Sequence, residues 1–218
     1  MIVGTRSLWL AQTNAYALAR ERGGPGILVD APPDPAAVLA LTREADIRPV
    51  ALLLTHGHVD HMGGSGAVVS QTGVRAYAHP DDDFLTLDPS SQLKVLFGME
   101  PPGDFAPPAH LDPLEHGQVL DLAGISVRVL HTPGHTPGHC CLHVEEEGLL
   151  LSGDQLFAGS IGRTDLPGGD PEALAESMRS HVMSLADDTR VLPGHGPETT
   201  IGEERRNNPF RRLWEQGA

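Results

Sequence analysis

The chain has 218 residues, of which 39% are hydrophobic and 20% are charged, a composition typical of a globular protein and not of a disordered one. Its formal net charge is −14, so the surface repels phosphate backbones and we expect no nucleic-acid partner. No apolar run reaches the length of a membrane span, and the first residues lack the apolar core of a signal peptide.

Both cysteines of the sequence, Cys140 and Cys141, are adjacent in an apolar run. A disulfide between neighbouring residues is strained and rare, so we expect two buried thiols in a strand. Together with the missing signal peptide, the thiols predict a cytoplasmic protein without a membrane partner. The oligomeric state stays open.

The first third of the chain alternates predicted strands with predicted helices. Asp34 and Pro35 are typical of a helix start and open a helix over 34–47. A shorter helix is predicted over 61–73. Apolar and β-branched runs bounded by Gly and Pro predict strands over 2–5, 13–20, 26–30, 49–55 and 74–78.

Residues 80–116 interrupt this pattern. They are rich in Pro and Asp and show only a weak helical pattern near 90–98. A loop of this length in a compact domain is usually functional or mobile. We therefore interpret 80–116 as a lid over a functional site, with a plain surface covering as the alternative.

Regular patterns resume in the second half. The clearest helix runs over 170–185 and opens on Asp170 and Pro171, and a short helix is predicted over 202–208. Strands are predicted over 125–131, 138–145, 149–154 and 189–196. Because strands dominate both halves and no linker separates them, we predict an α/β (α+β) fold of two packed sheets, with residues 1–218 as a single domain.

One short stretch, "THGHVDHMGG", concentrates potential metal ligands directly after a predicted strand. His56, His58, Asp60 and His61 lie within six residues. In an extended segment His56 and His58 point the same way. Imidazole and carboxylate groups are ligands for zinc and also for iron or manganese. The alternative, a solvated polar loop, explains one histidine better than it explains this cluster.

Three later strand ends carry matching groups beside glycine. "HTPGHTPGH" offers His131, His135 and His139, "LSGD" ends on Asp154, and "LPGHG" ends on His195. Loops at strand ends are where an α/β scaffold brings distant residues to one site.

This combination of motifs resembles the metallo-β-lactamase superfamily over nearly the whole chain. "FAGSIGRTDLPGG" and "LPGHGPETTIGEERRNNPF" are most similar to the small, single-domain hydrolases of the glyoxalase II type. The resemblance implies a four-layer αββα sandwich with the site at one edge between the sheets.

The resemblance also implies a ligand set for two divalent metal ions, with zinc as the expected metal and iron or manganese as alternatives. Asp60 and Asp154 would be both ligands and catalytic residues, with Asp154 and a hydroxide as the bridges. The first ion would be held by His56, His58 and His135, and the second by Asp60, His61 and His195.

Several further residues have weaker assignments. Asp30 in "VDAP" would orient the ligand loop, or would only close a strand-end turn. Arg163 and Asp165 in "GRTD" predict an ion pair that shapes the loop after Asp154, or a plain surface pair. We expect His131 and His139 to pack beside the ligands. Ordinary structural or surface roles are expected for His79, His110, His116, His143 and His181.

The C-terminal part departs from the resemblance. The glyoxalase II enzymes carry an extra helical region whose basic and tyrosine side chains hold glutathione, whereas this chain ends soon after its "PGHG" motif and has Pro197 near the position of a tyrosine. Arg205 and Arg206 are candidates to bind a substrate carboxylate instead.

The glyoxalase II resemblance implies a metal-dependent hydrolase that cleaves a hydroxyacyl thioester such as S-D-lactoylglutathione. A thiolate leaves with a pKa of roughly 8.5 and needs little help from a general acid. The alternatives are a mononuclear-iron persulfide dioxygenase, whose relatives share "GRTD", and a lactone hydrolase. A secreted β-lactamase is disfavoured by the missing signal peptide, and a nuclease by the acidic surface.

Overall fold

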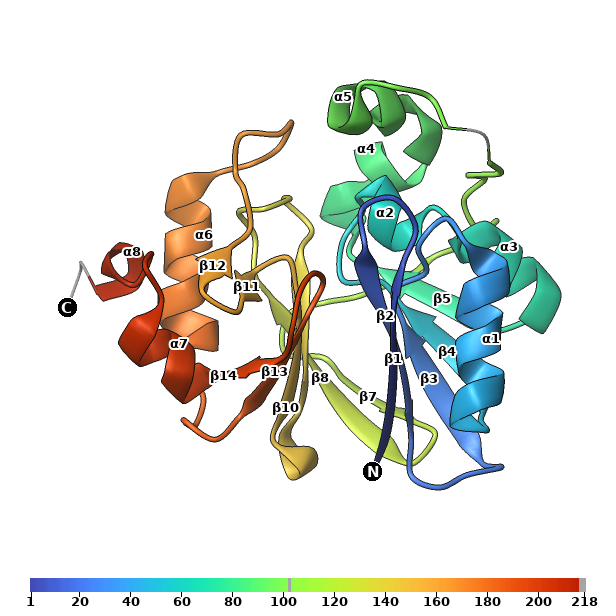
Figure 1. The fold of residues 1–218 in the computed structure, drawn as a ribbon, viewed down its shortest axis with the longest axis horizontal. Coiled ribbons are helices and arrows are strands. Elements are labelled where there is room, and N and C mark those ends of the chain that lie inside the picture. Colours follow the sequence, from blue (N-terminus) through green and yellow to red (C-terminus); the bar gives the residue numbers. More distant parts are fainter. Residues whose placement is uncertain (102, 216–218) are drawn as a thin grey trace. The chain divides into compact units, whose positions relative to one another are not determined.

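The computed structural model describes residues 1–101 and 103–215, and its backbone divides into two compact units. Unit 1 comprises Met1–Leu114 and Asp121–Ile125, and unit 2 comprises Glu115–Leu120 and the described residues from Ser126 onward. Each unit contains a mixed β-sheet with helices (Figure 1). The prediction that the whole chain forms one domain stays a prediction.

The sheet of unit 1 begins with an antiparallel meander and continues with parallel strands. All five strands that the sequence predicts for this region are present. In sheet order the strands are β1 (Ile2–Leu8), β2 (Thr13–Ala19), β3 (Pro25–Val29), β4 (Arg48–Leu53), β5 (Arg75–Ala78) and the two-residue β6 (Asp112–Pro113).

Helix α1 (Pro35–Ala45) confirms the predicted Asp-Pro start. The Asp34 carboxylate accepts a hydrogen bond from the Ala37 amide at 3.1 Å, which satisfies one of the donors that a helix leaves open at its first turn. Val38 and Leu41 project from this helix into the apolar core of unit 1, together with Leu28 and Leu52 of the sheet.

The helix predicted over 61–73 is two helices, α2 (Val59–Met62) and α3 (Ser65–Thr72). The break falls at Gly63 and Gly64, where the chain passes tightly against the segment after β3. The Gly64 amide donates to the Ala31 carbonyl at 2.8 Å, and a Cβ at Gly64 would overlap the Pro32 carbonyl oxygen. Glycine permits this close approach, and the approach ends the first helix.

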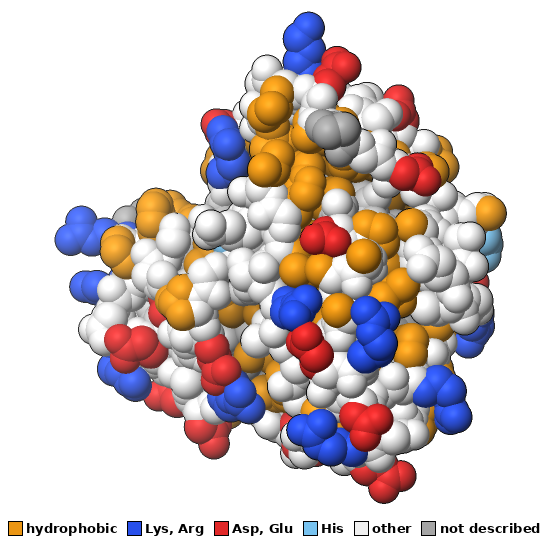
Figure 2. All heavy atoms as spheres, turned by 45° about the vertical axis from the view of Figure 1, so that its right-hand side comes forward, with side chains coloured by type: hydrophobic (Ala, Val, Ile, Leu, Met, Phe, Trp, Pro, Cys, Tyr) orange, Lys and Arg blue, Asp and Glu red, His pale blue; other side chains and the backbone are white. Residues whose placement is uncertain are grey.

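Residues 80–116 are more ordered than the sequence predicts. They contain the 3₁₀ turn η1 (Pro80–Asp82), helix α4 (Asp83–Thr86), the 3₁₀ turn η2 (Pro89–Gln92), helix α5 (Leu93–Phe97) and strand β6. Four large hydrophobic side chains of this region are exposed, namely Phe84, Leu87, Val95 and Met99. Figure 2 shows hydrophobic side chains on the surface of the molecule. The role of residues 80–116 as a lid stays a prediction.

The sheet of unit 2 contains the four predicted strands and two short ones that the sequence did not indicate. In sheet order the strands are β14 (Thr199–Thr200), β13 (Arg190–Pro193), β10 (Leu149–Gly153), β9 (Cys140–Val144), β8 (Ile125–His131) and β7 (Val119–Leu122). The hairpin of β11 (Leu156–Phe157) and β12 (Ser160–Ile161) follows Asp154.

The predicted helix over 170–185 is shorter and changes its winding. Helix α6 (Pro171–Ser177) starts on the Asp170 cap as predicted and continues into η4 (Met178–Val182), a π-helical turn. Leu174 and Met178 pack with Leu150 of the sheet and Trp214. The remaining elements of the unit are the 3₁₀ turn η3 (Glu145–Glu147), α7 (Ile201–Asn207) and α8 (Arg212–Glu215).

Strand direction decides where the candidate ligands emerge. In unit 1, β3 and β4 are parallel and β2 is antiparallel to β3, so the ends of β3 and β4 and the start of β2 share one edge of the sheet. In unit 2, β8 and β10 are each antiparallel to β9, and β13 is parallel to β10. The carboxyl ends of β8, β10 and β13 therefore share one edge.

Candidate metal centre

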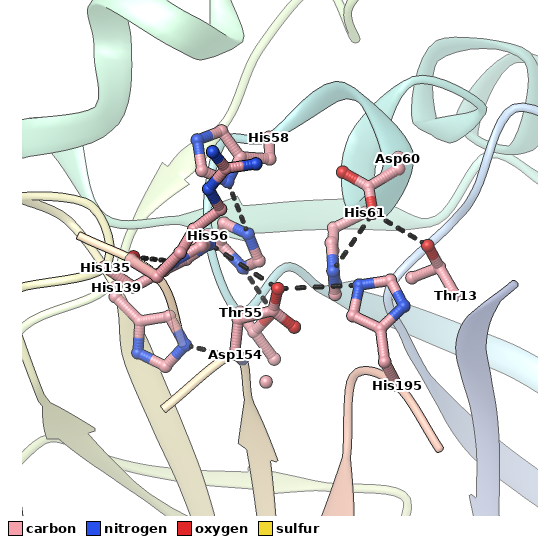
Figure 3. A network of polar contacts seen from close by, with 12 residues as sticks. Thr13, Thr55, His56, His58, Asp60, His61, His135, His139, Asp154 and His195 are labelled. Carbon is pink, nitrogen blue, oxygen red and sulfur yellow. Dashed lines mark hydrogen bonds and ion pairs between the residues drawn. The ribbon is translucent and has the colours of Figure 1, made fainter. Parts of the chain in front are cut away.

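The four clustered ligands predicted from the sequence lie together in unit 1, where the chain leaves β4 and enters α2 (Figure 3). His56 and His58 occupy the connection, with His58 as the residue before the helix, and Asp60 and His61 lie within it. All four are buried, each with at most 7% of its surface exposed. Burying three imidazoles and a carboxylate is costly unless hydrogen bonds or a metal ion compensate.

Asp30 holds two of these histidines in one orientation. Its Oδ2 lies 2.8 Å from Nδ1 of His61, so that ring donates from Nδ1 and presents Nε2. The Thr55 hydroxyl donates to the same oxygen at 2.9 Å and lies 3.1 Å from Nδ1 of His56. Because this hydroxyl uses its hydrogen on Asp30, it accepts from His56, which likewise presents Nε2.

The Nε2 atoms of His56 and His61 each lie close to another potential metal ligand of the cluster. Nε2 of His56 lies 3.1 Å from Nδ1 of His58, and Nε2 of His61 lies 3.5 Å from Oδ2 of Asp60. Nitrogen and oxygen atoms at these distances suit a shared cation, and Nδ1 of His56 and of His61 are already held by Thr55 and Asp30. The chemistry of this donor set therefore fits metal ions such as zinc, iron or manganese.

Thr13, at the start of β2, is a contact of this cluster that the sequence analysis missed. Its hydroxyl donates to Oδ2 of Asp60 at 2.8 Å, and its own surface is fully buried. No motif marks this threonine. It reaches Asp60 only because the pairing of β2 with β3 brings the start of β2 to the edge where β3 and β4 end.

The three candidate ligands of unit 2 also lie together. Oδ2 of Asp154 is 3.5 Å from Nε2 of His135 and 3.5 Å from Nε2 of His195 (Figure 3). Nδ1 of His135 donates to the Arg163 carbonyl at 2.7 Å, so Nε2 is again the nitrogen left for a ligand role. One carboxylate oxygen thus lies between two imidazole nitrogens.

His139 contacts the backbone of Asp154. The Asp154 amide donates to Nε2 of His139 at 3.0 Å, and Nδ1 of His139 lies 2.9 Å from the Thr132 hydroxyl. Both ring nitrogens of His139 are therefore used within the protein. This is the packing role that we expected from its place beside His135.

Arg163 and Asp165 form the predicted ion pair, with nitrogen–oxygen distances of 2.6 and 2.7 Å. The hydrogen bond from Arg163 lowers the pKa of Asp165 to about 2, and the same bond raises the pKa of Arg163. Both side chains are exposed, so the pair itself adds little stability. The contact with His135 comes from the backbone of Arg163 and not from its guanidinium group.

Arg205 has a structural role that competes with substrate binding. Its guanidinium group pairs with Asp187 and donates to the carbonyl oxygens of Met183 and Leu185 at 2.7 and 2.8 Å. Arg206 lies 3.4 Å from the same Asp187 carboxylate and is more exposed. The substrate role of both arginines stays a prediction, and the contacts of Arg205 tie it to the loop before β13.

The remaining histidines are placed outside the two ligand groups. His79 caps η1 by accepting from the Asp81 amide at 3.2 Å, and His110 lies 3.1 Å from an Asp112 oxygen. His116 and His181 stack with ring centres 4.6 Å apart. His131 donates to the Pro137 carbonyl at 2.8 Å, and burial lowers the pKa of His143.

Comparison with known proteins agrees with this geometry. A family model described as the metallo-beta-lactamase superfamily matches residues 8–195, and the chain belongs to that superfamily. The hydroxyacylglutathione hydrolase GloC of Haemophilus influenzae is 39% identical over 167 residues, which cover 77% of this chain and 78% of GloC. Together with the His and Asp donors, these likenesses support a metal-dependent hydrolase.

Two solved structures resemble the whole chain. The BLEG-1 B3 metallo-beta-lactamase superposes with a TM-score of 0.87 at 35% identity, covering 96% of this chain and 99% of BLEG-1. TTHA1623 in a di-iron-bound form gives a TM-score of 0.84 at 41% identity, covering 94% and 98%. They confirm the predicted α/β fold of the metallo-β-lactamase type. Among the described residues no helix has the length and apolar character of a membrane span.

Proposed function

We propose that the protein is a dinuclear metal hydrolase in which the ligands of unit 1 and those of unit 2 bind the same two ions. The observation that carries this proposal is the placement of one Asp154 oxygen at 3.5 Å from Nε2 of both His135 and His195, which suits a carboxylate shared by two ions. On its own, unit 2 offers three candidate ligands, which are too few for two ions. In unit 1 the candidate ligands form two pairs, His56 with His58 and Asp60 with His61, and the bridging carboxylate that we propose, Asp154, belongs to unit 2.

The distribution of ligands follows the pattern expected for the family. His56, His58 and His135 would hold the first ion, and Asp60, His61 and His195 would hold the second. Asp154 would be a ligand of both. Nδ1 of His56, His61 and His135 is held by Thr55, Asp30 and the Arg163 carbonyl respectively, so that each of these rings presents Nε2.

When bound, divalent metal ions polarise an acyl oxygen and lower the pKa of water towards 7. In thioester hydrolysis a water oxygen joins the acyl carbon, the C–S bond breaks, and the sulfur leaves as a thiolate; the two protons of the water pass to solvent and to the thiolate, which leaves a carboxylate and a thiol. The thiolate is a good leaving group, so the protein needs no strong general acid. Neither cysteine is suited to act as a nucleophile, because both are buried and burial raises the pKa of Cys141 to about 12.

We infer that the substrate is a small hydroxyacyl thioester such as S-D-lactoylglutathione. The likeness to GloC over most of both chains supports this substrate class. We propose zinc as the metal, and the di-iron form of TTHA1623 makes iron the first alternative to test. No nucleic-acid or membrane partner is part of the proposal, and we keep the cytoplasm as the expected compartment.

The test is hydrolysis of S-D-lactoylglutathione by protein reconstituted with zinc or iron, followed by release of glutathione. We expect turnover that is lost in Asp60→Ala and kept in Asp121→Ala, which removes an exposed carboxylate of β7. No turnover by protein with both ions bound would refute this substrate. Turnover that survives Asp60→Ala would refute the two-ion mechanism.

β-Lactam hydrolysis is a second candidate because BLEG-1, a B3 metallo-beta-lactamase, is similar over almost the full length of both chains. A chromogenic cephalosporin assayed beside the thioester separates the two activities. Lactones, and glutathione persulfide with oxygen, complete the panel, since the sequence left a lactone hydrolase and a persulfide dioxygenase as alternatives. The substrate with the highest kcat/KM decides among them.

A further inference from the structure

Two buried polar side chains from the 80–97 region hold the backbone of the ligand loop in unit 1. The Gly57 amide donates to Oδ2 of Asp82 at 2.7 Å. Nε2 of Gln92 donates to the Gly57 carbonyl at 2.9 Å, and Oε1 of Gln92 accepts from the Val59 amide at 3.0 Å. Asp82 is 1% exposed and Gln92 6% exposed. The contacts thus fix the peptide groups on both sides of His58.

The Gln92 amide matches this position chemically. Its second Nε2 hydrogen goes to the Leu85 carbonyl at 3.0 Å, so both of its donors and its acceptor have partners. Glutamate has the same shape but no donor, and it would face two carbonyl oxygens. Satisfying these buried groups therefore requires glutamine.

Gln92 also supplies the cap that α2 lacks. His58 is the residue before this helix, where Ser, Asp or Asn would normally accept from the first amides, but its side chain makes no such bond. Oε1 of Gln92 accepts from Val59, the first residue of α2, in its place. The ring of His58 is thereby left to face His56.

Gly57 allows the two segments to approach. A Cβ at this position would lie 2.8 Å from Cβ of Leu85 and 3.0 Å from Cβ of Asp82, which is closer than real Cβ atoms come. The glycine between His56 and His58 therefore serves the contact with α4. The region around Asp82 and Gln92 is therefore packed closely against the ligand loop.

We propose that Asp82 and Gln92 are positioning residues that hold His58 in its metal-binding position. The inference rests on the proposed function, in which His58 is a ligand of the first ion. Neither residue touches the ion in this proposal. They act by restricting the backbone on either side of the ligand, and their loss weakens the first site more than the second.

The experiment is a Co²⁺ titration of metal-free protein, followed by visible absorption and by calorimetry. The binding phase that belongs to the first ion is identified as the one lost in His58→Ala. We expect Gln92→Ala and Asp82→Ala to weaken that phase by about 10-fold or more, the usual effect of removing a group that orients a ligand, and to leave the other phase within about 2-fold. The absorption bands of the first ion should also shift.

Asp104→Ala is the matched control, because it removes an exposed carboxylate of the same region, one that accepts from the Ala106 amide at 3.1 Å and lies outside η2. An equal loss of affinity in Asp104→Ala, a parallel loss in both phases, or no loss in Gln92→Ala would each overturn the inference. If Gln92→Ala does not fold, Asp82→Ala provides the same test. Failure of the wild-type protein to bind cobalt would instead refute the proposed function.

Discussion

The hydrogen bond from Thr13 to Asp60 offers a way to weaken the second ion without removing any ligand. Thr13→Val keeps the shape of the side chain and deletes the hydroxyl that donates to Oδ2 at 2.8 Å. Both residues are buried, so no bulk water replaces the lost donor. A hydrogen bond to a charged group contributes about 1.5–3 kcal/mol. Since about 1.4 kcal/mol is a tenfold change, the affinity for one ion should fall by about 10- to 100-fold.

The assay is a zinc titration with a competing chelator on wild-type protein and on Thr13→Val. Thr72→Val is the matched control, because it deletes a threonine hydroxyl that donates to the Val68 carbonyl at 2.7 Å in α3. We expect the control to bind both ions as the wild-type protein does. Unchanged affinity in Thr13→Val, or an equal loss in Thr72→Val, would refute the role that we assign to this hydroxyl.

Three further predictions concern unit 2. Gly162→Ala should lower the number of ions bound per chain, because the new Cβ would overlap the Asp154 carbonyl oxygen and displace a proposed ligand; metal analysis of the purified variant is the test, and an unchanged metal content would refute it. The folded-state pKa of Asp165 is lowered from 3.8 to about 2, so any stabilisation from its ion pair is present above pH 4 and is lost as the pH falls towards 2; melting curves of wild type and Asp165→Asn should converge there, and a constant difference would contradict this. Burial raises the pKa of Cys141 to about 12, so a thiol reagent at pH 8 should leave it unmodified in the native protein and react after denaturation.

The sequence shows where the candidate ligands lie along the chain because they follow recognisable strands. The apolar run before His56 is β4, the run before Asp154 is β10, and the run before His195 is β13. An apolar strand that stops beside glycine and a ligand is a local signal. Such signals can be read without knowing which strands pair.

The groups that orient the ligands carry no such signal. Thr13 becomes relevant only through the pairing of β2 with β3, and Gln92 lies in the weak helical pattern near 90–98, which does not indicate a contact with the ligand loop. Gly57 lacks a Cβ, which leaves room for Leu85 of α4, a residue distant in sequence. These assignments depend on tertiary contacts that composition and periodicity do not encode.

Arg205 shows that a local pattern does not reveal the partners that a side chain already has, and its substrate role stays a prediction. Its place in "EERRNNPF" indicated a cation available for a substrate carboxylate. In the structure its guanidinium group is bound to Asp187 and to two backbone carbonyls of the preceding loop. A basic residue near a motif is therefore weak evidence for substrate binding until its own partners are known.

The most direct test of the central claim, that both units serve the same two ions, is the number of zinc ions bound per chain in three variants. We expect wild-type protein to bind two ions, and His58→Ala and His135→Ala to keep one each, because both histidines belong to the first ion. The double variant should also keep one ion. Loss of both ions in the double variant would show that the two units bind metal separately and would contradict the proposal.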